Sequence, residues 1–353
     1  MRQLSRYTGR TVLGAVAVVL LVLLALDAIA ALIDGLRDLR NAFDFPELLL
    51  YVFVTMPARI YDSLPFAVLI GALVGLGSLA GSSELVVMRT AGVSLLRIAG
   101  FAARPVLLLI VVGGLLGEFV VPVSGQWAES RKMALLGEKE TFSARSGVWN
   151  REGDEFIHFN AIYPGGHLAG VARYRFDADY RLREASFAAR ANFRGDHWVE
   201  EDGVITRLND TATETDRFAT RRWDTDLSPD LLTLTMMAPD ALPMRRLGSY
   251  ADYLERQGLQ AGAYQLAYWS KVLQPAVIFS LLLVAVSFVF GPLRESTTGF
   301  RVFSGVLVGV VFQTSLKLLG PSSLVFGFPP FWAVTAPVLV CLAVGLVLLR
   351  RAA

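Results

Sequence analysis

Six long apolar runs dominate the hydrophobic pattern of the chain, and one long polar region separates the third run from the fourth. A helix needs about 20 mostly apolar residues to cross the hydrocarbon core of a bilayer. The runs that meet this criterion lie at 11–33, 62–81, 101–121, 267–290, 301–320 and 331–349. The pattern therefore predicts an α-helical membrane protein with six transmembrane helices, arranged as three spans, an insert and three further spans.

The stretch 46–61, which contains Pro46 and Pro57, has two interpretations. It either extends the second span or forms an interfacial helix on the outer side of the membrane. We favour the interfacial helix.

The polar region carries the period-two alternation that is typical of β-hairpins. The predicted hairpins are 147–159, turning at Glu152 to Asp154; 171–187, turning at Asp177 to Asp179; and 189–208, with turns near Gly195 and at Glu201 to Gly203. The stretch 247–258 places Leu247, Tyr250, Ala251 and Leu254 on one face of an amphipathic helix. We therefore expect 122–265 to be one β-domain, a sandwich or open barrel, inserted between helical regions 1–121 and 266–353.

The arginines predict the orientation of the spans. Arg89, Arg97 and Arg104 follow the second span, whereas the loop after the first span has mixed charge. The positive-inside rule then places the N-terminus in the cytoplasm, and an even number of spans returns Arg350 and Arg351 to the same side. The first run lacks a small-residue cleavage site, so we expect an uncleaved anchor. The insert is then predicted to be on the outer side.

The composition of the 353-residue chain excludes several function classes. It is 54% hydrophobic and 18% charged, too apolar for an ordinary soluble protein, and its net charge of +2 is too small to indicate a nucleic-acid partner. The single Cys341 cannot form an internal disulfide. No G-x-x-x-x-G-K-[ST] phosphate loop, H-E-x-x-H pair or G-x-S-x-G elbow occurs. We expect no enzymatic activity, no metal and no cofactor in this chain, with energy supplied by another protein.

The segment 82–94, SSELVVMRTAGVS, lies between the second and third spans on the predicted cytoplasmic side. Ser82 and Ser83 precede an apolar run, and Glu84 falls in the first turn, where a carboxylate suits the helix dipole. The pattern predicts a short helix across the inner face. It is either a docking surface for a separate motor protein or a loop that caps two spans.

Several motifs in this sequence, taken jointly, resemble a known family. They are LIGALVGLGSLA at 69–80, SELVVMR at 83–89, Gly117-Glu118 with Pro122, YQLAYWSKVLQP at 264–275, FGPLR at 290–294, and Gly320-Pro321 with Gly327, Pro329 and Pro330. Over essentially the whole chain these resemble the LptF/LptG (YjgP/YjgQ) lipopolysaccharide export permeases. ELVVM and FGPLR look more like the G-type subunit than its F-type partner.

The resemblance implies an ABC transporter in the bacterial inner membrane that extracts lipopolysaccharide from the outer leaflet and passes it to a periplasmic bridge. The implied partners are an F-type permease subunit in a heterodimer, a dimeric cytoplasmic ATPase that uses ATP, and a single-span, LptC-like periplasmic partner. The insert is implied to be a periplasmic β-jellyroll-like domain.

The resemblance also implies site residues. Glu84 matches the family's coupling-helix glutamate, so the segment 82–92 is expected to meet the ATPase. The ATPase-coupling residues expected there are Ser83, Glu84, Leu85, Met88 and Arg89.

The family's charged positions at the outer end of the first span map onto 31–38. This chain has Asp34 and Arg37 there, but Ala31 and Asp38 where relatives carry lysines. Lipid A carries anionic phosphates, which cations at the outer rim of an apolar cavity would bind. The substrate-binding residues expected at this depth are Asp34, Arg37, Arg40 and Arg59.

Two other function classes stay open. The chain is alternatively a mechanical signalling subunit of ABC type, which moves a periplasmic domain without passing substrate, or a proton-coupled secondary transporter. The lack of an acid or histidine near the middle of a span argues against the secondary transporter.

Overall fold

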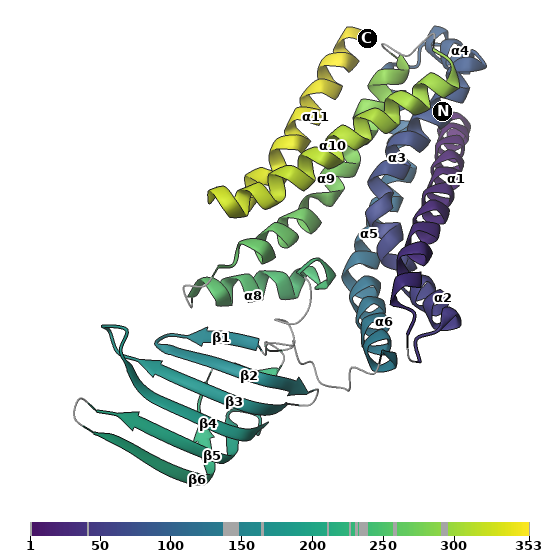
Figure 1. Ribbon diagram of the computed structural model, residues 1–353. Coiled ribbons are helices and arrows are strands. Elements are labelled where there is room, and N and C mark those ends of the chain that lie inside the picture. Colours follow the sequence, from purple (N-terminus) through teal and green to yellow (C-terminus); the bar gives the residue numbers. More distant parts are fainter. Residues whose placement is uncertain are drawn as a thin grey trace. The chain divides into compact units, whose positions relative to one another are not determined.

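A computed structural model describes residues 2–40, 42–136, 148–163, 166–209, 212–225, 227–229, 232, 239–256, 260–290 and 296–352 (Figure 1). The chain folds as two compact units. The helical unit comprises Met1–Lys132, Pro243–Arg245 and Gly262–Ala353, and the β-unit comprises Met133–Leu242 and Arg246–Ala261.

Six helices among the described residues are long and apolar enough to cross a membrane, which confirms the six predicted spans. They are built from α1 (Arg2–Gly35), α3 (Met56–Gly81), α5 (Leu95–Leu115), α9 (Gly262–Phe290), α10 (Thr298–Phe326) and α11 (Pro330–Ala352). After α5 the helix continues through a π-helical turn, η2 (Leu116–Val120), into α6 (Val121–Leu135). The third helix thus runs well into the stretch that the sequence assigned to the insert.

The stretch 46–61 divides between its two interpretations. Its first part lies in α2 (Phe45–Val54), a separate helix of 10 residues, which is too short to span a bilayer. The Asp44 side chain caps α2 by accepting a hydrogen bond from the Glu47 amide at 3.2 Å. From Met56 onward the stretch belongs to α3 and extends the second span.

Glycines on α3 allow a close approach between α3 and α1. A Cβ at Gly71 would lie 2.5 Å from the Val16 Cα on α1, and one at Gly75 would lie 3.0 Å from the Val12 Cα. Small residues four apart let helix backbones pack closely in membranes, where packing and hydrogen bonding drive association. Another glycine of α3, Gly77, instead leaves room for a side chain of α10.

The β-unit contains one six-stranded antiparallel sheet in which neighbouring strands follow the chain order, so the described strands form an open sheet and not a closed barrel. The strands are β1 (Val148–Glu152), β2 (Glu155–Tyr163), β3 (His167–Phe176), β4 (Leu182–Phe193), β5 (Trp198–Leu208) and β6 (Thr213–Trp223). Each strand pairs with the next, as successive hairpins require.

The predicted turns next to Gly153, after Asp177 and near Gly195 are confirmed. The turn predicted at 201–203 is wrong, because β5 continues through it. Glu201 and Gly203 each pair with both β4 and β6, so two neighbouring strands hold the segment extended. Between them Asp202 takes a positive φ of 53°, a local irregularity within the strand.

The core of the β-unit is formed by apolar residues on one side of the sheet and by the segment after β6. Its most buried members include Ile157, Phe159, Val171, Trp198 and Trp223. The predicted amphipathic helix is α8 (Met244–Arg256), and all four residues predicted on its apolar face are buried. Residues 257–258 of that prediction lie outside the described residues.

A charged side chain is buried in the same sheet. Arg173 is 4% exposed, and its guanidinium donates hydrogen bonds to Glu155 at 2.9 and 3.1 Å and to Glu200 at 3.1 Å. The guanidinium also lies 4.8 Å from the ring centroid of Trp223. Burial of the charge is tolerated because two carboxylates compensate it.

Candidate functional site

Segment 82–92 forms the predicted short helix, α4 (Glu84–Thr90). Ser83 precedes it in the left-handed conformation, with φ of 63°, which turns the chain sharply between α3 and α4. Leu85 and Met88 are only 3% and 5% exposed and pack into the core of the helical unit. These two side chains therefore fasten α4 to the bundle.

The outward face of α4 contains Val86, Val87, Arg89 and Thr90, which are all exposed. Val87 is 64% exposed. Beside this face lies a groove of about 410 Å³, lined by Ala80, Leu85, Val86, Arg89, Thr90, Val289 and Phe290. The sequence prediction missed Val86 and Val87, although helical periodicity separates them from Leu85 and Met88 and could have identified them.

The carboxylate of Glu84 is half-buried and tied to its surroundings. Its Oε1 accepts a hydrogen bond from the Ser82 hydroxyl at 2.9 Å and another from the Tyr7 hydroxyl of α1 at 3.3 Å. The first residue of α4 thus contacts the first span directly.

Three of the four predicted substrate-binding residues lie close together in the chain at the end of α1. Asp34 is in its last turn, Arg37 is in the 3₁₀ turn η1 (Leu36–Asp38), and Arg40 forms a β-bridge with Phe43 in the following loop. All three residues are exposed. Within the part of the chain that the structure describes, neither Asp34 nor Arg37 forms a side-chain hydrogen bond or ion pair.

The fourth predicted residue, Arg59, is not brought into this group. Its guanidinium, on α3, forms an ion pair with Asp27 of α1 and a weaker contact with Thr55 at 3.4 Å. Asp27 precedes Asp34 by seven residues, about 10 Å along the helix axis. The Arg59 side chain is 20% exposed and that of Asp27 is 46% exposed. Ionisable groups at such a depth in a span favour a functional interpretation.

Basic residues on α6 also reach this end of the helical unit. Arg131 forms two hydrogen bonds with the Glu47 carboxylate, at 2.8 and 2.7 Å, which lower the pKa of that carboxyl. Lys132 bonds Asp38 at 2.7 Å. Sequence reasoning missed these residues because it assigned them to the insert, although AESRKMAL at 128–135 favours a helix.

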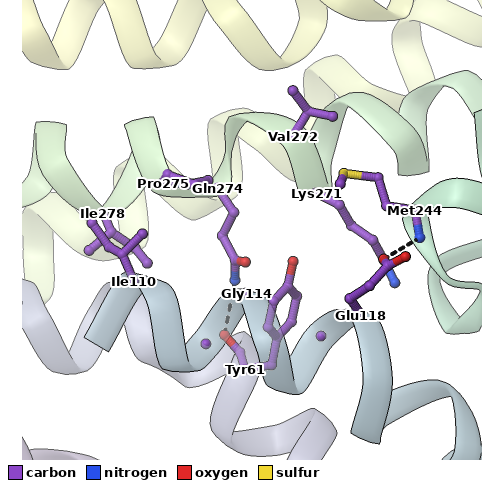
Figure 2. A pocket seen from close by; sticks show the side chains of 12 residues that line it. Tyr61, Ile110, Gly114, Glu118, Met244, Lys271, Val272, Gln274, Pro275 and Ile278 are labelled. Atoms are coloured by element: carbon purple, nitrogen blue, oxygen red, sulfur yellow. Dashed lines mark hydrogen bonds between the residues drawn. The ribbon is translucent and has the colours of Figure 1, made fainter. Parts of the chain in front are cut away.

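A second cavity, of about 240 Å³, lies among α3, the α5–η2 helix and α9 (Figure 2). At its polar end, the Glu118 Oε2 accepts a hydrogen bond from the Met244 amide at 2.8 Å, and the Lys271 side chain points toward Glu118. Gln274 donates to the backbone carbonyl of Tyr61 at 3.1 Å. The π-helical turn that positions Glu118 is a feature often found at functional sites.

Among the described residues, no group of three or more histidine, cysteine, aspartate or glutamate side chains is arranged to hold a metal ion. The FGPLR motif lies outside the described residues except for Phe290.

Comparison with known families and proteins gives a consistent result over the whole chain. A family model described as "Lipopolysaccharide export system permease LptF/LptG" matches residues 6–351. The lipopolysaccharide export system permease protein LptG of Escherichia coli strain K12 is 32% identical over 355 residues, which cover 99% of this chain and 98% of that protein. The protein of the same name from Haemophilus influenzae is 30% identical over 354 residues, with the same coverage.

Proposed function

The chain belongs to the LptF/LptG family of lipopolysaccharide export permeases, as an LptG-type subunit, and from this premise we propose how it works with its partners. It is a multi-pass membrane protein and a permease subunit for lipopolysaccharide export, not an enzyme. The match to LptG relatives over 99% of the chain carries this conclusion, and it favours the permease over a mechanical signalling subunit or a secondary transporter.

The proposed transporter lies in the bacterial inner membrane, with both termini in the cytoplasm and the β-unit in the periplasm. This chain pairs with an F-type permease subunit, and a single-span periplasmic partner adds one further helix. Exposed apolar helices support this assembly. Only 6% of the residues in the most apolar stretch of α1 are buried, and only 17% of those in α10, compared with 67% in α3. Such surfaces are covered by lipid or by neighbouring helices in a membrane.

The lipid path in this proposal begins beside α1. Arg37 and Arg40 bind a phosphate of lipopolysaccharide, the acyl chains occupy the apolar space between the two permease subunits, and the β-unit receives them on the way to the periplasmic bridge. The exposed guanidinium of Arg37 supports this role, because guanidinium groups bind phosphate with two parallel hydrogen bonds.

Arg59 has a different role in the proposal, since Asp27 already neutralises it. The exchange variant, which combines Asp27→Arg with Arg59→Asp, tests whether Arg59 forms an internal ion pair or binds the lipid phosphate. An internal ion pair predicts that each single variant loses lipopolysaccharide export and that the exchange variant recovers most of it. If Arg59 instead binds the lipid phosphate, the exchange variant stays as inactive as Arg59→Asp.

ATP hydrolysis takes place in a separate dimeric ATPase that docks on the outward face of α4 and its groove. The exposed valines and Arg89 support such a contact, because exposed apolar side chains rimmed by polar ones mark protein interfaces. ATP-driven closure of the ATPase then pushes on segment 82–92.

The experiment that tests the proposed function is purification of the chain with its native partners, followed by ATP-driven release of lipopolysaccharide from proteoliposomes. Glu84→Arg is expected to lose the ATPase from the purified complex, whereas the control Glu214→Arg, on exposed β6, retains it. A complex that contains neither an ATPase nor lipopolysaccharide, or a Glu84→Arg complex with a full complement of ATPase, refutes the proposal.

A further inference from the structure

Two polar contacts connect the region around α4 to helices that are far from it in sequence. One contact joins Glu84 to α1. The other joins α10 to Gly77 of α3, seven residues before Glu84. Both lie within the helical unit, and Figure 1 shows α4 beside the N-terminal end of α1.

The first contact is the hydrogen bond from the Tyr7 hydroxyl to the Glu84 Oε1, at 3.3 Å. Tyr7 and Glu84 are 77 residues apart, so the bond joins two separate elements and stabilises no local turn. Ser82 donates to the same oxygen at 2.9 Å and holds the carboxylate in place for Tyr7. A displacement of the first turn of α4 therefore acts on α1 through this hydroxyl.

The second contact involves Arg301 in the first turn of α10. Its side chain is buried, with 3% of the residue exposed, and its Nη1 donates to the backbone carbonyl of Gly77 at 2.5 Å. Gly77 leaves room for the guanidinium, because a Cβ there would lie 2.9 Å from the Arg301 Nη1 and 3.0 Å from its Cδ. A buried guanidinium bonded to a neighbouring helix is costly to detach, so α10 follows the end of α3 that leads into α4.

The helices reached by these contacts are the two spans with the least burial in the chain, α1 and α10. By contrast, 67% and 56% of the residues in the most apolar stretches of α3 and α9 are buried. The contacts thus join the segment that receives the push to the two spans whose outer faces are open to lipid or to partner helices.

We propose that Tyr7 and Arg301 are positioning residues that transmit movement of segment 82–92 to α1 and α10, so that ATP hydrolysis is coupled to lipid release. The inference rests on the proposed function, because it requires that an ATPase acts on α4. Neither residue contacts the ATPase face of α4 in this scheme. Their loss uncouples the transporter and leaves its assembly intact.

The test uses the complete complex in proteoliposomes and measures lipopolysaccharide released per ATP hydrolysed. Tyr7→Phe removes only the hydroxyl, and we expect the ratio to fall by about threefold, the effect of losing one partly solvated hydrogen bond to a charged group. The control Tyr180→Phe removes an exposed hydroxyl of the β-unit and is expected to leave the ratio unchanged. Arg301→Met keeps the apolar stem of the side chain but removes the donor, with the exposed Arg217→Met as its control.

A Tyr7→Phe complex that retains the ATPase and releases less lipopolysaccharide per ATP supports the proposal. An unchanged ratio of release to hydrolysis overturns it, and this includes the case in which both rates fall by the same factor. If Glu84→Arg loses the ATPase while Tyr7→Phe keeps the wild-type ratio, the inference fails and the proposed function stands. If wild-type complexes show no ATP-driven release, both fail. Tyr7→Phe keeps the test decisive if Arg301→Met does not assemble.

Discussion

Replacing Gly71 with alanine tests whether the α1–α3 contact depends on direct backbone approach. The added Cβ would lie 2.5 Å from the Val16 Cα and 2.7 Å from the Val16 backbone nitrogen. Carbon atoms pack best at about 3.5–4.0 Å, so the two helices must separate by about 1 Å to admit the methyl group. Two of the three nearest atoms, the Val16 Cα and backbone nitrogen, belong to the backbone and cannot turn aside as the end of a side chain could.

The cost of the substitution follows from this geometry. Overpacking in a close-packed interior typically costs about 1–3 kcal/mol, and the involvement of backbone atoms favours the upper half of that range. Alanine also favours a helix over glycine by up to about 1 kcal/mol, which acts in the opposite direction. Gly14→Ala controls for this second effect, because Gly14 lies on α1 and a Cβ there would meet nothing within 4 Å.

The assay is unfolding of the purified full chain in mixed micelles with increasing sodium dodecyl sulfate, followed by the circular dichroism of its helices. We expect the free energy of unfolding of Gly71→Ala to be about 2 kcal/mol below that of Gly14→Ala. If the two variants agree within about 0.5 kcal/mol, the usual scatter of neutral substitutions, the close approach of α1 and α3 contributes nothing to stability and the reasoning is refuted.

Two further predictions concern the β-unit of the full chain. Arg173→Ala leaves the carboxylates of Glu155 and Glu200 buried without their guanidinium, so we expect the free energy of unfolding to fall by about 3–5 kcal/mol. Thermal unfolding followed by tryptophan fluorescence measures this change. A fall below about 1 kcal/mol would contradict the stabilising role of these ion pairs. Hydrogen bonds led by the Arg181 amide lower the pKa of the Asp177 carboxyl, so its stabilisation of the β3–β4 turn is present at neutral pH and is lost as the pH falls through the lowered pKa. The protection factors of the turn amides against hydrogen exchange, which take account of the slower intrinsic exchange in acid, should therefore fall in acid for the wild type and change much less for Asp177→Asn. An equal fall in both would exclude this carboxyl as the cause.

Much of the candidate site could be located from the sequence, but its internal arrangement could not. Serines, an acid and an apolar run predicted a short helix within 82–94, and the structure has this helix at Glu84–Thr90, because periodicity is a local property. The Ser83 side chain, however, makes no capping hydrogen bond. Which of its residues face the core depends on where α3 and α9 pack. The structure turns Leu85 and Met88 inward and leaves Val87 at the surface.

The charged residues show the same limit more clearly. The sequence analysis placed Arg59 with Arg37 in one predicted site, because depth in the membrane can be counted along each span. The structure separates them, because Arg59 lies across from Asp27 when α1 packs against α3. No spacing rule predicts an ion pair between residues 32 positions apart.

The sequence by itself determined the membrane spans, the hairpins and the family, because hydropathy, period-two alternation and turn residues act over short stretches of chain and a bilayer tolerates few other solutions. Only the tertiary structure decided that β5 runs straight through Asp202, that Arg173 is buried, and that Tyr7 meets Glu84. Each of these outcomes depends on neighbours supplied by distant segments. The free energy of a buried charge, an extended strand or a hydrogen bond is set by those neighbours and not by the local sequence.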